Sequence, residues 1–527
     1  MKQKNKGKPI STEQIKKAYR TLLSYRDAKQ TLDKRIVENE EWFRLRCCGN
    51  KTPDQELQQN SAWLFNSILN KHADAMDCYP EPNVLPREQS DCEDAKQLSQ
   101  ILPVILEQRG FEQTYSDVWW YKLKTGTGIY GVFWNNSLEG GLGDIDIKQL
   151  DILNLFWEPN IKNIEQSKNL FYVQSVDKET FLNEYSFAAQ DLLSEDEVLE
   201  SYNRDDGMCD HDKILVIDWY YKVKQGAKTV LHYCKFAGNT ILFASENEPE
   251  YRTRGFYDHG KYPVVFDTLF VTETGPAGFG YIDIMKGCQR SIDRLDAAVI
   301  KNVMLAETPR WFISDAAGIN EEEYADWSKP FVHTTGRIDD ETLKQISVDG
   351  INSMALSLLR YKVDELKETS GNRDFSQGGT SSGVTAASAI IALQEAAGKL
   401  SRDMVKSSFR AYSKICYIMV ELIRQFYTEP RAFRITKQGA KDKFIIYKGN
   451  RLLPKSNSSP LFRRPIFDIK IVPQKQNPYQ KAQQNELAKE LFSLGMLTPQ
   501  RKKEALIALQ IMDFDGKDAV IKQLNQL

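Results

Sequence analysis

The chain has 527 residues, and its 70 lysines and arginines nearly balance 72 aspartates and glutamates, for a formal net charge of −2. This length predicts about two to four domains, and the balanced charge excludes a uniformly polycationic protein that grips nucleic acid tightly. The sequence offers no run of about 18 apolar residues for a membrane helix, and no apolar segment follows the basic N-terminus as in a secretory signal. The eight cysteines are scattered without a CxxC pair, which indicates reduced thiols and no zinc site.

The N-terminal part is predicted to be helical. Residues 1–35 hold eleven basic and three acidic side chains, so this arm has a net charge of +8. Ser11 and Gln14 form the pattern of a capping box, and nothing breaks the helix from there to Arg46. Further helices are predicted over 57–79 and 91–124, and Pro103 predicts that the second is kinked or divided into two.

Residues 129–270 change in character to short β-branched and aromatic runs separated by Gly, Asn and Pro, which predicts an antiparallel β region with helical insertions. Within it, residues 181–218 hold eleven acidic and two basic side chains, a net charge of −9. We interpret this run as a solvated loop and helix face.

The second half returns to helix. Apolar spacings of three and four predict helices over 281–305 and 351–369, which bracket a compact insertion. A polar Gly/Ser-rich loop then leads to the longest predicted helix, which Pro430 ends. Residues 431–470 are predicted as short strands with eleven basic and two acidic side chains, a net charge of +9, and the chain is helical again after Pro478.

Three patterns resemble catalytic or ligand-binding motifs without meeting their requirements. The GxGxxG of residues 126–131 follows a predicted helix and precedes a strand, the reverse of a dinucleotide site, and so predicts a structural turn. The GxxxxG of residues 378–383 lacks the lysine of a phosphate loop. Residues 210–212, Asp-His-Asp, stand in an acidic loop without a second ligand cluster. We therefore expect no catalytic residue, cofactor or metal, and no enzyme.

The helix predicted over 281–305 carries four cations that fall within about 80° of one face. We call them the cationic stripe: Lys286, Arg290, Arg294 and Lys301. Two interpretations stay open. The stripe is either a solvated face balanced by nearby aspartates or a face turned toward a polyanion.

Four stretches, in this order along the chain, resemble the portal proteins of tailed bacteriophages and prophages. They are WLFNSILNKHADAMDCYPEPNVLPRE (63–88), SDVWWYKLKTGTGIYGVFWN (116–135), GYIDIMKGCQRSIDRLDAAVIKN (280–302) and GGTSSGVTAASAIIALQEAAGK (378–399). None is a catalytic signature, so the specificity lies in the ordered set.

The resemblance implies an α+β, predominantly helical portal-type fold, assembled as a ring, in which wing, stem, clip and crown surround a DNA channel. The implied parts are a wing over 1–280, stem helices over 281–305 and 351–369, a clip over 306–350, a tunnel loop over 370–383, a bent wing helix over 384–428, a basic β segment over 429–477 and crown helices over 478–527.

The resemblance also implies partners and contact residues. We expect a ring of about twelve copies at the capsid vertex of the virion, formed in the host cytoplasm, that passes double-stranded DNA without reading its sequence. The implied partners are the terminase large subunit, the head–tail adaptor, and the major capsid and scaffolding proteins. We expect no membrane contact. The candidate contacts are tunnel-loop residues Asn372, Arg373, Phe375 and Gln377 toward DNA, the cationic stripe toward the channel, and Arg310, Trp311 and Phe312 in the clip. Those clip residues could equally serve subunit packing.

Two other classes remain as alternatives. A packaging nuclease or ATPase would need a Walker lysine or a carboxylate cluster that binds metal, and the sequence offers neither. A shell or scaffolding protein would form sheets or cages in place of closed rings.

Overall fold

The computed structural model describes residues 9–46, 61–185, 213–225, 228–307, 310–346 with short gaps, 353–371, 399–435, 443–453 and 465–473, together with a few residues between 490 and 523. The chain divides into two compact units. The first comprises Met1–Met76 and Pro82–Ile471, and the second comprises Asp77–Glu81 and Val472–Leu527. The helices and strands below belong to the first unit, apart from the outer ends of strands β1 and β14.

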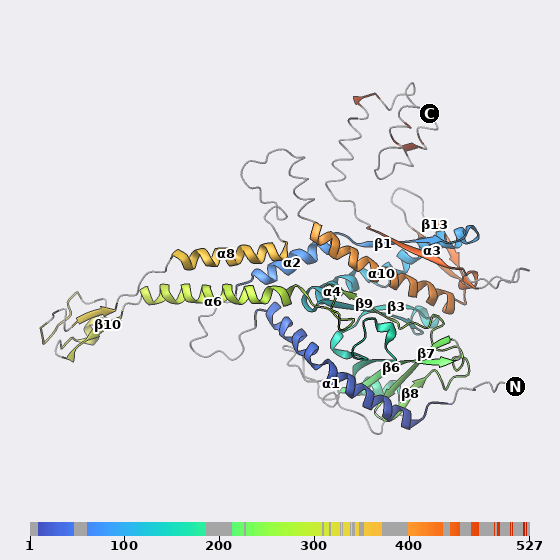
Figure 1. Cartoon of the computed structure of the whole chain (residues 1–527), viewed down its shortest axis with the longest axis horizontal. Coiled ribbons are helices and arrows are strands. Elements are labelled where there is room, and N and C mark those ends of the chain that lie inside the picture. Colours follow the sequence, from blue (N-terminus) through green and yellow to red (C-terminus); the bar gives the residue numbers. More distant parts are fainter. Residues whose placement is uncertain are drawn as a thin grey trace, which may run out of the picture. The chain divides into compact units, whose positions relative to one another are not determined.

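Helix α1 spans Thr12–Phe43 and begins with the predicted capping box, in which the Ser11 hydroxyl accepts from the Gln14 amide and the Gln14 side chain accepts from the Ser11 amide. One face of the helix packs on a β-sheet, where Ile15, Leu22 and Tyr25 join Phe171 and Trp219 in one apolar core. Figure 1 shows α1 lying along strands β6 and β8. The sheet therefore fixes the position of this helix.

Three more helices precede the β region: α2 (Trp63–Met76), α3 (Cys92–Gln108) and α4 (Phe111–Thr125). The region predicted as one kinked or divided helix is divided, but at Gly110 and not at Pro103. Pro103 lies inside α3, whereas Gly110 has a φ of 61°, a left-handed conformation that glycine adopts at little cost. The break places α4 beside the first strand of the β region.

The β region consists of two antiparallel sheets. The smaller has the order β3-β2-β9 and the larger the order β4-β5-β6-β7-β8. The strands of the two sheets are β2 (Thr127–Asn135), β3 (Asp144–Gln149), β4 (Leu155–Trp157), β5 (Asn169–Asp177), β6 (Lys213–Gln225), β7 (Lys228–Ala237), β8 (Thr240–Ala244) and β9 (Val264–Thr268). A short helix, α5 (Lys178–Glu184), follows β5. The acidic run continues into residues 186–212, which lie outside the described residues.

Helices α6 (Tyr281–Glu307) and α8 (Ser353–Ser370) run side by side, and we call this pair the hairpin. At about 1.5 Å per residue they are about 40 and 27 Å long. Their connection contains strand β10 (Arg310–Ile313), helix α7 (Glu321–Ala325) and strand β11 (Leu343–Ile346), and β10 pairs antiparallel with β11. We call this connection the insertion; in Figure 1 strand β10 lies at one end of the hairpin.

Helix α10 (Lys399–Phe426) contacts β2, β9 and helix α2. We call α10, helices α1 to α4 and the two sheets together the body. It is followed by the antiparallel pair β12 (Arg431–Ile435) and β13 (Lys443–Tyr447). Strand β1 (Pro80–Pro86) pairs with β14 (Phe467–Pro473), and Arg87 beside them forms an ion pair with Asp468. The described residues of the basic segment thus contain three strands and a short 3-10 helix over Gly449–Leu452; residues 436–442 and 454–464 lie outside the described part.

Candidate functional site

The base of the hairpin is held by buried polar contacts. Asp283, in the first turn of α6, accepts hydrogen bonds from the Gly280 amide and from the Asn39 side chain of α1, each at 3.0 Å. Gln289 is buried one and a half turns later; its carbonyl accepts from the Leu64 amide, and its amide donates to Ser61. Since these contacts come from α1 and from the start of α2, the hairpin is anchored to two different helices.

Glycines allow the base of the hairpin to approach the body. Gly126 ends α4 with a φ of 89°, and a Cβ there would lie 2.1 Å from the carbonyl carbon of Phe279, next to the start of α6. A Cβ on Gly128 would lie 2.3 Å from Val118 of α4. The GxGxxG pattern is therefore a turn with close packing, as predicted, because only glycine fits these positions.

The two inner residues of the cationic stripe bind helix α1 of the same chain. Lys286 forms an ion pair with Glu38 at 2.9 Å, and this hydrogen bond lowers the pKa of the Glu38 carboxyl below its usual value. The Arg290 guanidinium lies 5.3 Å from the ring centroid of Trp42. Farther out, Arg294 and Lys301 are exposed. The stripe is thus divided into an inner pair on α1 and an outer pair toward solvent.

The insertion presents exposed aromatic side chains. Phe312 on β10 is 66% exposed and Phe331 is 75% exposed, and Tyr324 on α7 is exposed as well. Arg310 and Trp311 lie on β10, and their side chains are outside the described part. Sequence reasoning selected Phe312 but missed Tyr324 and Phe331. Their aromatic character inside a polar insertion was the only available signal.

The predicted tunnel-loop residues Asn372, Arg373, Phe375 and Gln377 lie outside the described residues, but both ends of the segment that holds them are described. A Cβ on Gly371 would be 2.9 Å from Leu400, so residues 371 and 400 are neighbours. Beside them, the buried ammonium of Lys71 donates to the Ser401 hydroxyl at 2.9 Å, and that hydroxyl donates to Asp74 at 2.6 Å. Through these hydrogen bonds, helix α2 holds the start of α10 close to the end of α8.

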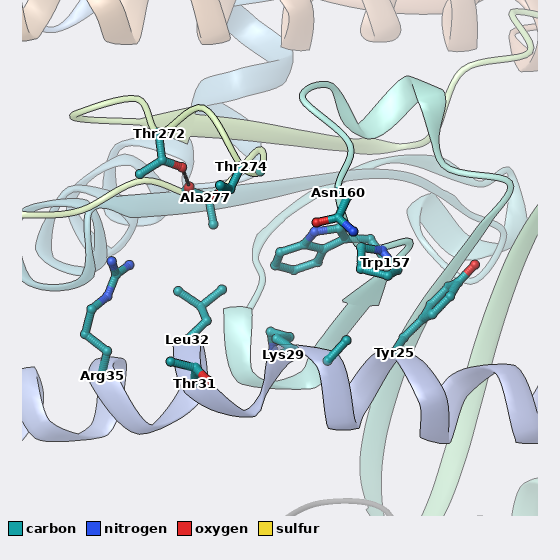
Figure 2. A pocket seen from close by; sticks show the side chains of 13 residues that line it. Tyr25, Lys29, Thr31, Leu32, Arg35, Trp157, Asn160, Thr272, Thr274 and Ala277 are labelled. Carbon is teal, nitrogen blue, oxygen red and sulfur yellow. Dashed lines mark hydrogen bonds between the residues drawn. The ribbon is translucent and has the colours of Figure 1, made fainter.

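A cavity of about 560 Å³ lies between α1 and the loops that follow β4 and β9. Figure 2 shows Lys29, Leu32 and Arg35 of α1 across from Trp157 and Thr272. The Lys29 ammonium already donates to the Ile152 carbonyl at 2.6 Å and pairs with Asp33 at 2.9 Å, and burial lowers its pKa. Because these groups satisfy Lys29, its ammonium is not available to bind a ligand in the cavity.

Within the described residues, no group of three or more His, Cys, Asp or Glu side chains is placed to hold a metal ion. Among the helices that the structure describes, none combines the length and apolarity needed to cross a bilayer. Residues 210–212 lie outside the described part.

These elements define an α+β protein in which two long antiparallel helices bracket a small β insertion and a third long helix returns over the body. A family model described as Phage P22-like portal protein matches residues 74–264 and 232–527, together most of the chain. The chain therefore belongs to the P22-like phage portal protein family and acts as a phage portal, the connector between head and tail. No curated protein matches the sequence significantly.

Proposed function

We propose that this portal protein forms a closed ring whose central channel conducts double-stranded DNA during packaging and ejection. The observation that carries the proposal is the family match, which extends from residue 74 to residue 527. A ring of identical copies needs head-to-tail contacts, in which one face of a subunit meets a different face of the next. Twelve copies remain our expected number.

We assign the parts of the ring to the elements above. The hairpin of α6 and α8 would form the stem, and the insertion the clip. Residues 1–280 with α10 and the basic strands would form the wing, and residues 478–527 the crown. Supporting this assignment, the hairpin is anchored at its base by Asp283 and Gln289, while its far end carries a separate small β-structure. A rigid stem with a projecting clip needs such an arrangement.

The loop over 370–383 is our candidate for the segment that approaches DNA. Its sequence, SGNRDFSQGGTSSG, combines glycines with side chains that can contact phosphates without reading bases. The described residues on either side of 372–398 support the assignment, because Lys71, Asp74 and Ser401 hold the start of α10 near Gly371.

Low friction is the physical requirement for a channel that must let DNA slide. Each phosphate that a protein neutralises adds affinity, and a ring repeats every lysine in every copy. In this chain, Lys286 is neutralised by Glu38, and Arg290 lies over Trp42. Two of the four cations of the stripe therefore interact with side chains of the same chain. This supports a channel that binds DNA weakly rather than one that holds it tightly.

The outward partners follow from the same assignment. The clip, with its exposed aromatic side chains, would bind terminase during packaging and the head–tail adaptor afterwards, at the capsid vertex of the virion. Major capsid and scaffolding proteins would contact the wing. Assembly would take place in the host cytoplasm.

Electron microscopy of the purified protein tests the central proposal. We expect closed rings with a central channel in top views, and class averages would give the number of copies. A protein that stays monomeric at all concentrations, or a ring without a channel, would contradict it.

A further inference from the structure

Helix α10 presents a row of cations on its exposed side. Lys399, Lys406, Arg410 and Lys414 are all exposed, and their positions fall within about 80° of one another around the helix. At about 1.5 Å per residue, the four positions extend over about 22 Å of the helix. We call these four residues the α10 row.

The α10 row lies opposite the buried face of its helix. Ser408 is buried, and its hydroxyl donates to the buried carboxylate of Asp267 on β9. Arg410 lies about 160° around the helix from Ser408. The packing of α10 on the sheet therefore turns the row toward solvent.

The charges of the α10 row are not neutralised by the surrounding protein. Among the side chains that the structure describes, no carboxylate forms an ion pair with a member of the row. Asp403 is the one acidic residue between Lys399 and Lys414, and it is exposed on the same side of the helix. In this respect the row differs from the inner part of the cationic stripe, where Lys286 pairs with Glu38.

A straight row of cations fits a ligand whose negative charge repeats along its length. Double-stranded DNA carries about one negative charge per 1.7 Å of its axis, so about 22 Å of duplex presents about 13 phosphates. Lysine and arginine side chains bind phosphate oxygens without reading the bases. The row can therefore meet several phosphates in any register and with any sequence.

The position of the α10 row points to the same ligand. Lys399 precedes Leu400, and a Cβ on Gly371 would lie 2.9 Å from Leu400. Gly371 belongs to the segment 370–383, our candidate for the loop that approaches DNA. Figure 1 shows α10 beginning close to the end of α8. The row thus starts beside that segment and continues away from it along α10.

We infer that the α10 row binds the phosphate backbone of double-stranded DNA and extends the DNA contact from the segment 370–383 along α10. The choice of DNA as the ligand rests on the proposed function. Binding of this kind is electrostatic and independent of sequence, and it lets a protein slide along DNA. The row is therefore compatible with a channel through which DNA moves.

The inference is tested by measuring how purified full-length protein binds a fluorescently labelled duplex of about 30 base pairs over about 50 to 200 mM salt. Lys406→Gln combined with Arg410→Gln should weaken binding about tenfold or more. It should also reduce the slope of log affinity against log salt by about two, because two phosphate contacts are lost. Asp403→Asn should change binding in the opposite direction, since it removes the carboxylate that repels phosphate.

A matched control removes two lysines that already have carboxylate partners. Lys148 pairs with Asp146 and Lys168 with Glu158, and their side chains are 57% and 80% exposed. Lys148→Gln combined with Lys168→Gln removes the same net charge as the row variant. It should leave both the affinity and the salt slope close to those of wild type.

Three outcomes would overturn the inference. The row variant and the control would bind DNA equally well if only net charge mattered. A row variant that loses the ring would assign the row to contacts between subunits, and one that binds DNA normally but loses an acidic partner protein would assign it to that protein. Wild type that forms channelled rings but does not bind the duplex would overturn the inference and leave the proposed function standing, whereas the absence of rings would contradict the proposed function.

Discussion

Lys122 and Asp267 form an ion pair inside the body, with Nζ 2.7 Å from Oδ1 and side chains that are 0% and 1% exposed. Lys122 comes from α4 and Asp267 from β9, and the Ser408 hydroxyl of α10 donates to the other oxygen of the same carboxylate. Burial lowers the pKa of Lys122, and the Asp267 charge opposes that shift. Three elements far apart in sequence are thus joined at one carboxylate.

Removing this carboxylate should destabilise the body strongly. Asp267→Ala leaves the Lys122 ammonium buried without its counter-charge, and we expect the free energy of unfolding to fall by about 3–5 kcal/mol. Urea denaturation followed by circular dichroism would measure the loss. Lys122→Met combined with Asp267→Asn removes both charges and keeps an acceptor for Ser408, so it should recover most of the stability. Equal stability of the single and double variants would refute this account.

The left-handed glycine beside the hairpin base gives a second prediction. Gly126→Ala should destabilise the protein more than Gly110→Ala, although both positions have a positive φ. At Gly110 an added Cβ meets open space, so only the backbone penalty of about 1–2 kcal/mol applies. At Gly126 the Cβ would overlap the Phe279 backbone, which adds about 1–3 kcal/mol or more. Thermal unfolding of the two variants side by side would decide, and similar losses would argue against the close packing.

A buried histidine predicts how stability changes with pH. His232 is fully buried and bonded to the Ser245 hydroxyl through Nδ1, and burial lowers its pKa from the usual 6.5. Below pH 6.5 His232 takes up a proton in the unfolded chain, whereas the buried imidazole of the folded protein stays neutral down to a lower pH. The folded state therefore keeps the full contribution of His232 above pH 6.5 and loses it progressively as the pH falls toward the lowered value.

The experiment compares wild type with His232→Gln by urea denaturation at pH 5 and pH 7.5. Wild type should lose more stability than the variant when the pH falls from 7.5 to 5. Each unit by which burial lowers the pKa of His232 should change the unfolding constant tenfold, which is about 1.4 kcal/mol in the free energy of unfolding. The pKa of nearby Glu246 is raised by burial, which acts in the opposite direction, but Glu246 is present in both proteins. His333→Gln in the exposed insertion is the control. Equal acid sensitivity of wild type and His232→Gln would be incompatible with the prediction.

Aromatic side chains of the insertion should matter for partners and not for the ring. Phe312→Ser or Phe331→Ser should leave ring formation intact and weaken binding of terminase or adaptor about tenfold or more, because exposed aromatic anchors carry much of an interface's energy. We expect the same of Trp311→Ala. Pull-down and electron microscopy would measure binding and assembly, with Ser328→Ala as control. Loss of the ring would instead assign these residues to subunit packing.

The helices of the hairpin were predictable because each has a regular apolar repeat without an internal proline. The structure has α6 over Tyr281–Glu307 and α8 over Ser353–Ser370, within two residues of the predicted ends. The capping box at Ser11 and the turn at Gly126 were predictable for a similar reason, since a few neighbouring residues determine them. The division at Gly110 was not, because sequence alone favours Pro103 as the break.

The candidate site residues divide in the same way. The cationic stripe could be recognised from helical spacing, but spacing does not show that Lys286 meets Glu38 and Arg290 meets Trp42, two residues about 250 positions earlier in the chain. Phe331 was missed because it lies in an irregular segment where no periodicity distinguishes an exposed aromatic from a buried one.

By itself, the sequence determined the class of the protein and the local elements, because the order of its motifs, its helical repeats, caps and turns depends on residues close together in the chain. Its net charge of −2 excluded a tight polycation and said nothing about where charges meet. Only the tertiary structure decided that Lys122, Asp267 and Ser408 share one buried site, and that Lys286 of α6 pairs with Glu38 of α1. The physical reason is that burial and ion pairing arise between segments far apart in sequence, so the packing of those segments decides which charges are paired and which stay exposed.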